Sequence, residues 1–105
     1  MTSDVIFRAL GDPTRRSLFE RLVAAEGAVG DLGVALGVSQ PAVSQHLAVL
    51  RAAKLVTMRQ AGRQRFYRAR PEGLAPLFDW LTHYQKFWPE KLESLKAMLK
   101  KRGEK

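Results

Sequence analysis

One stretch near the middle of the chain constrains the fold more than any other, because it reads as a tight turn followed by a one-sided helix. Gly37 suits the left-handed residue that ends a preceding helix, and Ser39 can cap the next helix by accepting a hydrogen bond from a first-turn N–H. Pro41 is tolerated there, because first-turn N–H groups have no helical partner to lose. The sequence therefore predicts one helix that ends at Gly37 and a second that follows Ser39.

The second helix has an apolar side and a small, hydrogen-bonding side. The positions expected to point inward recur at helical spacing and are Val43, Leu47, Leu50 and the stem of Lys54. The other side carries Gln40, Ser44, Gln45 and Arg51. Glutamine can bond adenine through two hydrogen bonds and serine can bond a base edge or a phosphate, so this face suits a DNA major groove. An ordinary amphipathic surface helix fits this stretch equally well.

The charge of the chain is unevenly placed. The formal net charge is +8, yet no Asp or Glu occurs from Leu32 to Pro71, a stretch with seven Lys or Arg residues, while the remainder has 11 basic and 10 acidic residues. A phosphate backbone explains this asymmetry, because Arg and Lys displace its counterions and supply affinity that does not depend on sequence. RNA or an acidic membrane surface would also fit the charge alone.

Length and composition fit one compact domain over residues 1–105, with 46% hydrophobic residues available for a core. No apolar run approaches the length of a membrane span, and the N-terminus, with Asp4 and Arg8 among its first residues, lacks the apolar region of a secretory signal, so we expect a cytoplasmic protein. The absence of cysteine excludes disulfides, thiolate metal sites and cysteine nucleophiles, and leaves histidine or carboxylate ligands open.

Two N-terminal helices are predicted over residues 1–25. The first runs from Ser3 to about Leu10, and the second begins after Asp12, a good cap with a proline behind it. The second helix is expected to bury Leu18, Phe19, Leu22 and Val23. Arg15 and Arg16 either contact phosphate or simply belong to a solvated first turn.

The helix-turn-helix is predicted over 28–54 and a β-hairpin over 55–70. A helix from Ala28 to Leu36 precedes the turn, with its apolar positions inward. Period-two patterning on both sides of Gly62-Arg63 then predicts a hairpin that pairs Met58 with Tyr67 and Arg59 with Phe66. A two-stranded hairpin of this size needs a helix beneath it.

Residues 73–100 read as one long amphipathic helix. Its apolar positions, spaced three or four apart, are Leu74, Leu77, Phe78, Leu81, Tyr84, Trp88, Leu92, Leu95 and Leu99. Pro89 is expected to kink or interrupt the helix. This stripe exceeds what a small domain can cover, so it predicts a partner helix or a ligand pocket, with part of it packed on the first helix.

Three motifs together resemble the ArsR-type winged-helix regulators: residues 11–16 (GDPTRR), 39–47 (SQPAVSQHL) and 62–63 (GR). The resemblance implies a mainly α fold with a small β-hairpin wing (α+β), a winged helix-turn-helix that forms a homodimer through its terminal helices. It also implies a DNA-binding repressor whose second helix enters the major groove, with Gln40, Ser44 and Gln45 as reading residues. His46 matches a position usual in the family, where a packed or phosphate-bonded role is expected.

The chain departs from that family at its metal sites. The thiolate sensors of the family carry Glu-Leu-Cys-Val-Cys-Asp-Leu, whereas residues 26–32 here read EGAVGDL, which leaves Ala28 and Gly30 at the cysteine positions. A second family site uses Asp and His from the last helix. The local candidates are Asp79, His83, Glu90 and Glu93. Because the paired second histidine is missing, no metal site is expected.

The sequence therefore predicts a dimeric transcriptional repressor on an inverted-repeat operator of double-stranded DNA, without catalysis or cofactor and with no effector indicated. The predicted DNA contacts are Ser39, Gln40, Pro41, Ser44, Gln45, His46, Arg51, Arg59, Arg63 and Arg65. The predicted dimer interface comprises Val5, Ile6, Leu10, Leu77, Trp80, Leu81, Tyr84, Trp88, Leu92 and Leu95. An RNA-binding winged helix and a protein-binding adaptor stay open as alternatives. An enzyme is disfavoured, because the two histidines fall on separate helices without a carboxylate pair, phosphate loop or nucleophile motif.

Overall fold

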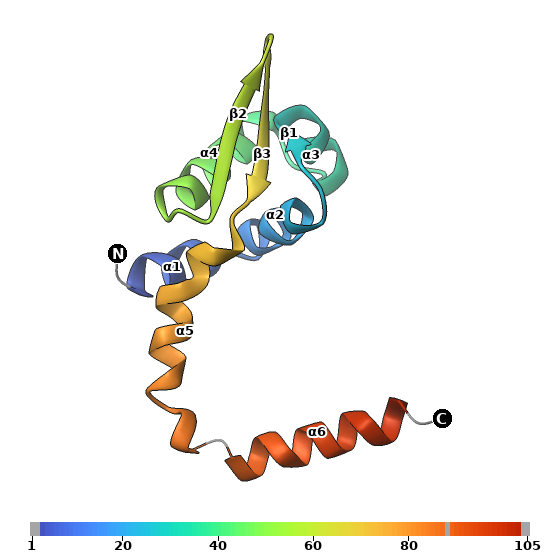
Figure 1. Ribbon diagram of the computed structural model, residues 1–105. Helices are drawn as coiled ribbons and strands as arrows, with labels where there is room; N and C mark the ends of the chain where they lie inside the picture. Colours follow the sequence, from blue (N-terminus) through green and yellow to red (C-terminus); the bar gives the residue numbers. More distant parts are fainter. Residues whose placement is uncertain (1–2, 88, 104–105) are drawn as a thin grey trace.

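The computed structural model describes residues 3–87 and 89–103 of the chain. Its elements, in order, are α1 (Ser3–Leu10), α2 (Pro13–Ala24), β1 (Gly27–Ala28), α3 (Val29–Leu36), α4 (Gln40–Ala52), β2 (Val56–Ala61), β3 (Gln64–Ala69), the 3-10 turn η1 (Pro71–Leu74), α5 (Ala75–Thr82), the 3-10 turn η2 (Gln85–Phe87) and α6 (Pro89–Gly103). Figure 1 shows α2, α3 and α4 gathered around the strands, while α5 leads away from this body to α6. The fold is a mainly α winged helix-turn-helix, as the sequence predicts.

The turn between α3 and α4 forms as expected. Gly37 adopts the left-handed conformation (φ 65°, ψ 34°), and the Ser39 hydroxyl accepts from the Ala42 N–H at 3.3 Å. The turn packs closely on α3, because a Cβ at Gly33 would lie only 2.8 Å from the Val38 carbonyl oxygen. A side chain at position 33 would therefore force the turn to shift.

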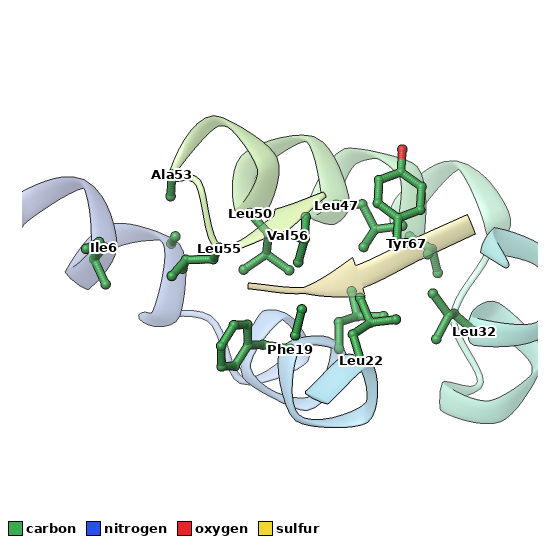
Figure 2. Packing of buried hydrophobic residues seen from close by; sticks show 14 residues of the cluster. Ile6, Phe19, Leu22, Leu32, Leu47, Leu50, Ala53, Leu55, Val56 and Tyr67 are labelled. Carbon is green, nitrogen blue, oxygen red and sulfur yellow. The ribbon is translucent and has the colours of Figure 1, made fainter. Parts of the chain in front are cut away.

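One apolar core joins α4 to the rest of the body. Its most deeply buried side chains are Ile6, Leu18, Leu22, Val43, Leu47, Leu50 and Leu55. Figure 2 shows that Leu47 and Leu50 of α4 lie across the strands from Phe19 and Leu22 of α2. The predicted inward positions of α4 are thus confirmed except Lys54, which is exposed. Lys54 lies beyond the end of α4 at Ala52, with a positive φ of 62° that takes it off the helical spacing.

The wing is the predicted hairpin with a third strand added. Met58 pairs with Tyr67 and Arg59 with Phe66, as expected, and the turn residue Gly62 has a φ of 63°. β1 extends the sheet to the order β1-β3-β2, antiparallel throughout, by pairing Gly27 with Tyr67. The predicted helix start at Ala28 is wrong by one residue, because Ala28 belongs to β1 and α3 begins at Val29.

Side-chain hydrogen bonds cap the start of α2 and join it to the end of α1. The Asp12 carboxylate accepts from the N–H groups of Thr14 (2.8 Å) and Arg15 (3.1 Å), which confirms the predicted cap. The Arg15 Nε donates to the Ala9 carbonyl oxygen (2.6 Å), and the Arg16 guanidinium donates to that of Leu10 (2.6 Å). Both arginines therefore bond to the end of α1 within the same chain. The sequence suggested only a phosphate contact or a solvated first turn for them.

Helix α2 also exposes one residue that the sequence predicts as buried. Val23 keeps 54% of its surface accessible, whereas Leu22 beside it is 1% exposed. At about 100° per residue, Leu18, Leu22 and Phe19 span the arc of α2 that faces the core, and Val23 lies beyond the edge of that arc.

The C-terminal segment is not one helix interrupted at Pro89. α5 already ends at Thr82, because the Asp79 carbonyl oxygen accepts from the Thr82 hydroxyl (2.7 Å) and the His83 N–H bonds to Trp80 instead (3.3 Å). α1 packs against α5, whereas α6 lies apart from the winged-helix body (Figure 1). Within residues 3–87 and 89–103, no helix has both the length and the apolar character that a bilayer crossing requires.

Candidate nucleic-acid interface

The outer face of α4 is exposed and hydrogen-bonding along its first two turns. Gln40, Pro41, Ser44 and Gln45 are all exposed, on the side of α4 away from the buried Val43 and Leu47. The side chains of Ser44 and Gln45 make no hydrogen bond with any residue that the structure describes. Their polar groups are therefore free for an external partner, whereas the Ser39 hydroxyl already serves as the helix cap.

A hollow of about 450 Å³ lies between this face and the wing. Its walls bring together Gln40 and Ser44 from α4 with Arg63 and Arg65 from the hairpin. Gln40 and Ser44 lie 19 or more positions before Arg63 and Arg65 in the sequence, yet all four border one concave surface. The structure thus joins the two groups that base reading and phosphate binding require.

Three of the predicted basic contacts are unpaired cations. Arg51, Arg63 and Arg65 are exposed, and none of them forms a hydrogen bond or ion pair within the described part of the chain. Arg51 follows Gln45 on α4 but does not line the hollow. The positive charge of this face is therefore available to an anion.

Arg59 differs from these three. Its guanidinium donates two hydrogen bonds to the Glu26 carboxylate, at 2.9 and 2.7 Å, and lies 4.7 Å from the centre of the Phe66 ring. The side-chain hydrogen bond from Arg59 lowers the pKa of Glu26, and the same bond raises the pKa of Arg59. Arg59, which the sequence predicts as a DNA contact, is therefore already paired within the chain, and a phosphate would compete with Glu26 for its guanidinium.

His46 is half-buried beside α2. Its Nδ1 lies 3.3 Å from the Arg15 guanidinium, which can only donate, so this contact is a hydrogen bond when Nδ1 carries no proton. Arg15 also donates to the carbonyl oxygens of Arg8 and Ala9 at the end of α1. His46 thus connects α4 to the α1–α2 corner.

Asp31 is a carboxylate that sequence reasoning did not place at this site. It lines the hollow with Gln40, Ser44 and the wing arginines, and it forms no ion pair with any described residue. Asp31 lies one position before the stretch from Leu32 to Pro71 that has no Asp or Glu. The charge pattern therefore did not predict a carboxylate near the wing arginines.

The described residues do not gather three His, Asp or Glu side chains that could hold a metal ion. Ala28, at the first aligned cysteine position, is buried in the sheet, and Gly30 borders the hollow. His83 directs its Nδ1 at the backbone carbonyl oxygen of Asp79 (2.9 Å) rather than at the Asp79 carboxylate.

The residues predicted to form the dimer interface differ in how exposed they are in the single chain. Val5, Trp80, Tyr84 and Leu95 are exposed, and Leu10, Leu77 and Leu81 are half-buried. Ile6 was assigned wrongly, because it is 0% exposed and belongs to the core of its own chain. Trp88 and the side chain of Leu92 lie outside the described part of the structure.

A run of exposed rings crosses from α1 to η2, and we call Phe7, Trp80, Tyr84 and Phe87 the aromatic surface. Phe7 meets Trp80 edge to face at 5.1 Å, and Trp80 lies 4.9 Å from Tyr84. Each of the four keeps at least 42% of its area exposed. So much aromatic area on one side is typical of a protein contact.

Comparison with known proteins agrees with this geometry. Residues 10–59 match a family described as a helix-turn-helix domain. The chain is 44% identical over 101 residues to the HTH-type transcriptional regulator Rv2034 of Mycobacterium tuberculosis, which covers 96% of this chain and 92% of that protein. It is 27% identical over 79 residues to the transcriptional repressor SdpR of Bacillus subtilis, covering 75% and 88% of the two chains.

A solved structure shows the same likeness. The ArsR-like transcriptional regulator from Rhodococcus sp. RHA1 superposes with a TM-score of 0.70 at 30% identity, over 90% of each chain. The sequence likeness spans 96% of the chain and the structural likeness spans 90% of it. The chain belongs to the ArsR family of winged helix-turn-helix transcriptional regulators, which are DNA-binding proteins and not enzymes.

Proposed function

We propose that this regulator is a dimeric repressor that occupies an inverted-repeat operator and reads it with the outer face of α4. The observation that carries the proposal is the hollow in which Gln40 and Ser44 face the wing arginines Arg63 and Arg65. Such an arrangement suits duplex DNA, because the amide and hydroxyl groups meet base edges where the arginines meet phosphates.

Each group of residues has a distinct task in this proposal. Gln40, Ser44 and Gln45 contact base edges, and Arg51, Arg63 and Arg65 neutralise phosphates. The cap residues Ser39 and Pro41 set where α4 begins, and His46 holds α4 against Arg15. Readout of bases and attraction to phosphates can therefore be removed separately by mutation.

The aromatic surface supports a second copy of the chain as the partner. Exposed aromatic rings are typical anchors of protein interfaces, and Leu95, Met98 and Leu99 of α6 add further exposed apolar area. A two-fold dimer presents two copies of α4 to one duplex, so half-sites should repeat in inverted order about 34 Å apart. Repression is favoured by the relative SdpR, which is named a transcriptional repressor. An operator as target places the protein in the cytoplasm with the DNA.

Base reading is tested by replacing Gln45 with alanine. Gln45→Ala should cost about 1–3 kcal/mol on the operator and much less on random duplex, measured by fluorescence anisotropy. Val23→Ala truncates an exposed side chain of α2 away from both the hollow and the aromatic surface, so it serves as the control and should change neither affinity. Equal losses on both duplexes would contradict base reading, and preferential binding of RNA or of a protein would support the alternative functions.

The dimer is tested at the centre of the aromatic surface. Trp80→Glu should yield monomers in sedimentation velocity and lose operator affinity although the α4 face is intact, because a charge there opposes apolar burial. Val23→Glu places the same charge on an exposed valine of α2 and should stay dimeric. A wild-type monomer at micromolar concentration, or a dimer that survives Trp80→Glu, would refute this interface.

A further inference from the structure

The side chain of Arg59 crosses the sheet from one edge to the other. It begins on β2, lies over the Phe66 ring of β3 at 4.7 Å, and ends on the Glu26 carboxylate just before β1. Three segments of the sheet are thus linked by one guanidinium. We call Glu26, Arg59 and Phe66 the wing clamp.

The clamp lies where the sheet changes from three strands to two. β1 pairs with β3 only through Gly27–Tyr67 and Ala28–Phe66, so Phe66 is the last residue of β3 that has neighbours on both sides. Beyond it, Arg65 pairs with β2 alone. A two-stranded ribbon is marginally stable by itself, so the angle of the tip depends on what holds its base.

The chemistry of the clamp suits a fixed angle. Two parallel N–H···O bonds from one guanidinium to one carboxylate restrict orientation as well as distance, and the ring beneath restricts the guanidinium plane. The hydrogen bond from Arg59 lowers the pKa of Glu26, a carboxyl that is already ionised at neutral pH at its ordinary pKa. A lysine at position 59 would keep the charge but lose the two-bond geometry.

We propose that Glu26 and Arg59 are positioning residues that set the angle of the wing, so that Arg63 and Arg65 reach phosphates when α4 lies in the major groove. This inference rests on the proposed DNA-reading function. It assigns Arg59 an indirect role, because its charge is already paired and its guanidinium lies at the base of the ribbon rather than in the hollow between α4 and the wing tip.

The test uses Glu26→Gln and Arg59→Lys, with Glu72→Gln as the charge-matched control. Glu72 is exposed and pairs with Arg70 at 3.5 Å, outside the wing, so its variant reproduces the change in net charge alone. Relative to this control, Glu26→Gln should weaken binding to operator and to random duplex alike. The slope of log affinity against log salt should fall by about one unit for each wing arginine displaced.

A double variant separates positioning from general damage to the fold. If the clamp acts through Arg63 and Arg65, adding Glu26→Gln to a protein that already carries Arg63→Ala and Arg65→Ala should cause no further loss of affinity or slope. A further loss of the same size in that background would overturn the proposal. Tighter binding and a steeper slope in Glu26→Gln would instead show that Arg59 is a phosphate ligand that Glu26 masks.

The mobility of the wing tip can be measured without DNA, which tests the clamp independently of the proposed function. Amide relaxation at Gly62, Arg63 and Arg65 should show a more mobile tip in Glu26→Gln and Arg59→Lys than in wild type or Glu72→Gln. Unchanged tip mobility would refute the clamp, even in a protein that binds DNA. A mobile tip together with a wild type that binds no duplex would leave the clamp standing and refute the DNA-reading function.

Discussion

Two serines of the reading region should respond to alanine in opposite ways. Ser39 caps α4 through a hydrogen bond of 3.3 Å from the Ala42 N–H, whereas the Ser44 hydroxyl is exposed and has no hydrogen-bond partner within the described structure. Losing a serine cap costs about 0.5–2 kcal/mol, and the long bond here favours the lower half of that range. For a domain of this size, Ser39→Ala should lower Tm by about 2–8 °C.

Ser44→Ala should instead leave Tm unchanged or slightly raised, because alanine has the higher helix propensity and no bond is lost. Its cost should appear on the operator, as a loss of about 1–3 kcal/mol or about 5–150-fold in affinity. Ser39→Ala should weaken operator and random duplex only modestly and to the same extent. The two changes therefore separate helix stability from base reading.

The assay pairs thermal unfolding by circular dichroism with anisotropy titrations on the operator and on a scrambled duplex. An unchanged Tm for Ser39→Ala would show that its hydroxyl does not stabilise α4. Operator affinity unaffected by Ser44→Ala would remove this residue from the reading face. If Ser44→Ala lowered Tm as much as Ser39→Ala, the division of roles between the two serines would be refuted.

Three further predictions concern charge, pH and metal. Arg63→Ala should weaken operator and random duplex equally and reduce the salt slope by about one unit, and an unchanged slope would move Arg63 off the DNA. The Arg15 backbone N–H lowers the pKa of Asp12, so the stability that this carboxylate provides should be fully present above a pH of about 4 and be lost as the pH falls through the lowered pKa. Urea denaturation should show a flatter acid limb for Asp12→Asn, and identical limbs would contradict the cap. Zinc, cadmium or arsenite should not release the protein from DNA, because Ala28 and Gly30 occupy the cysteine positions; release by stoichiometric metal, abolished in His83→Ala, would contradict this.

The features that sequence reasoning predicted correctly depend on neighbouring residues. Gly37, Ser39 and Asp12 act on N–H and C=O groups within five positions, so their roles follow from local backbone geometry. The wing register likewise follows from the two-residue turn at Gly62-Arg63. Helix periodicity identified the buried face of α4 for the same reason, since its spacing is a local property.

The features that were missed depend on contacts between distant segments. Arg59 is paired with Glu26, 33 positions away, and no local pattern marks that carboxylate as its partner. β1 has only two residues, and it is a strand only because β3 lies beside it. Ile6 shows a related problem, since periodicity indicates an apolar face but cannot say whether the same chain or another covers it.

The hollow between α4 and the wing depends both on local sequence patterns and on contacts between distant segments. Its polar members on α4 were predicted from the sequence, but their position opposite Arg63 and Arg65 depends on how the hairpin folds back over the body. Asp31 also lines the hollow because of the tertiary fold, since the sequence pattern of α3 indicated only which of its residues pack inward. The sequence thus predicted the groups that would meet DNA more readily than the concave surface on which they meet.

Selection of bound sequences from a random duplex pool, followed by hydroxyl-radical footprinting of the enriched duplex, shows whether two protomers read one operator. We predict an enriched inverted repeat, protected in two half-sites about 34 Å apart, and loss of that enrichment in the Ser44→Ala, Gln45→Ala double variant. A pool that enriches no motif, or a single unrepeated site bound tightly by one protomer, would contradict this prediction.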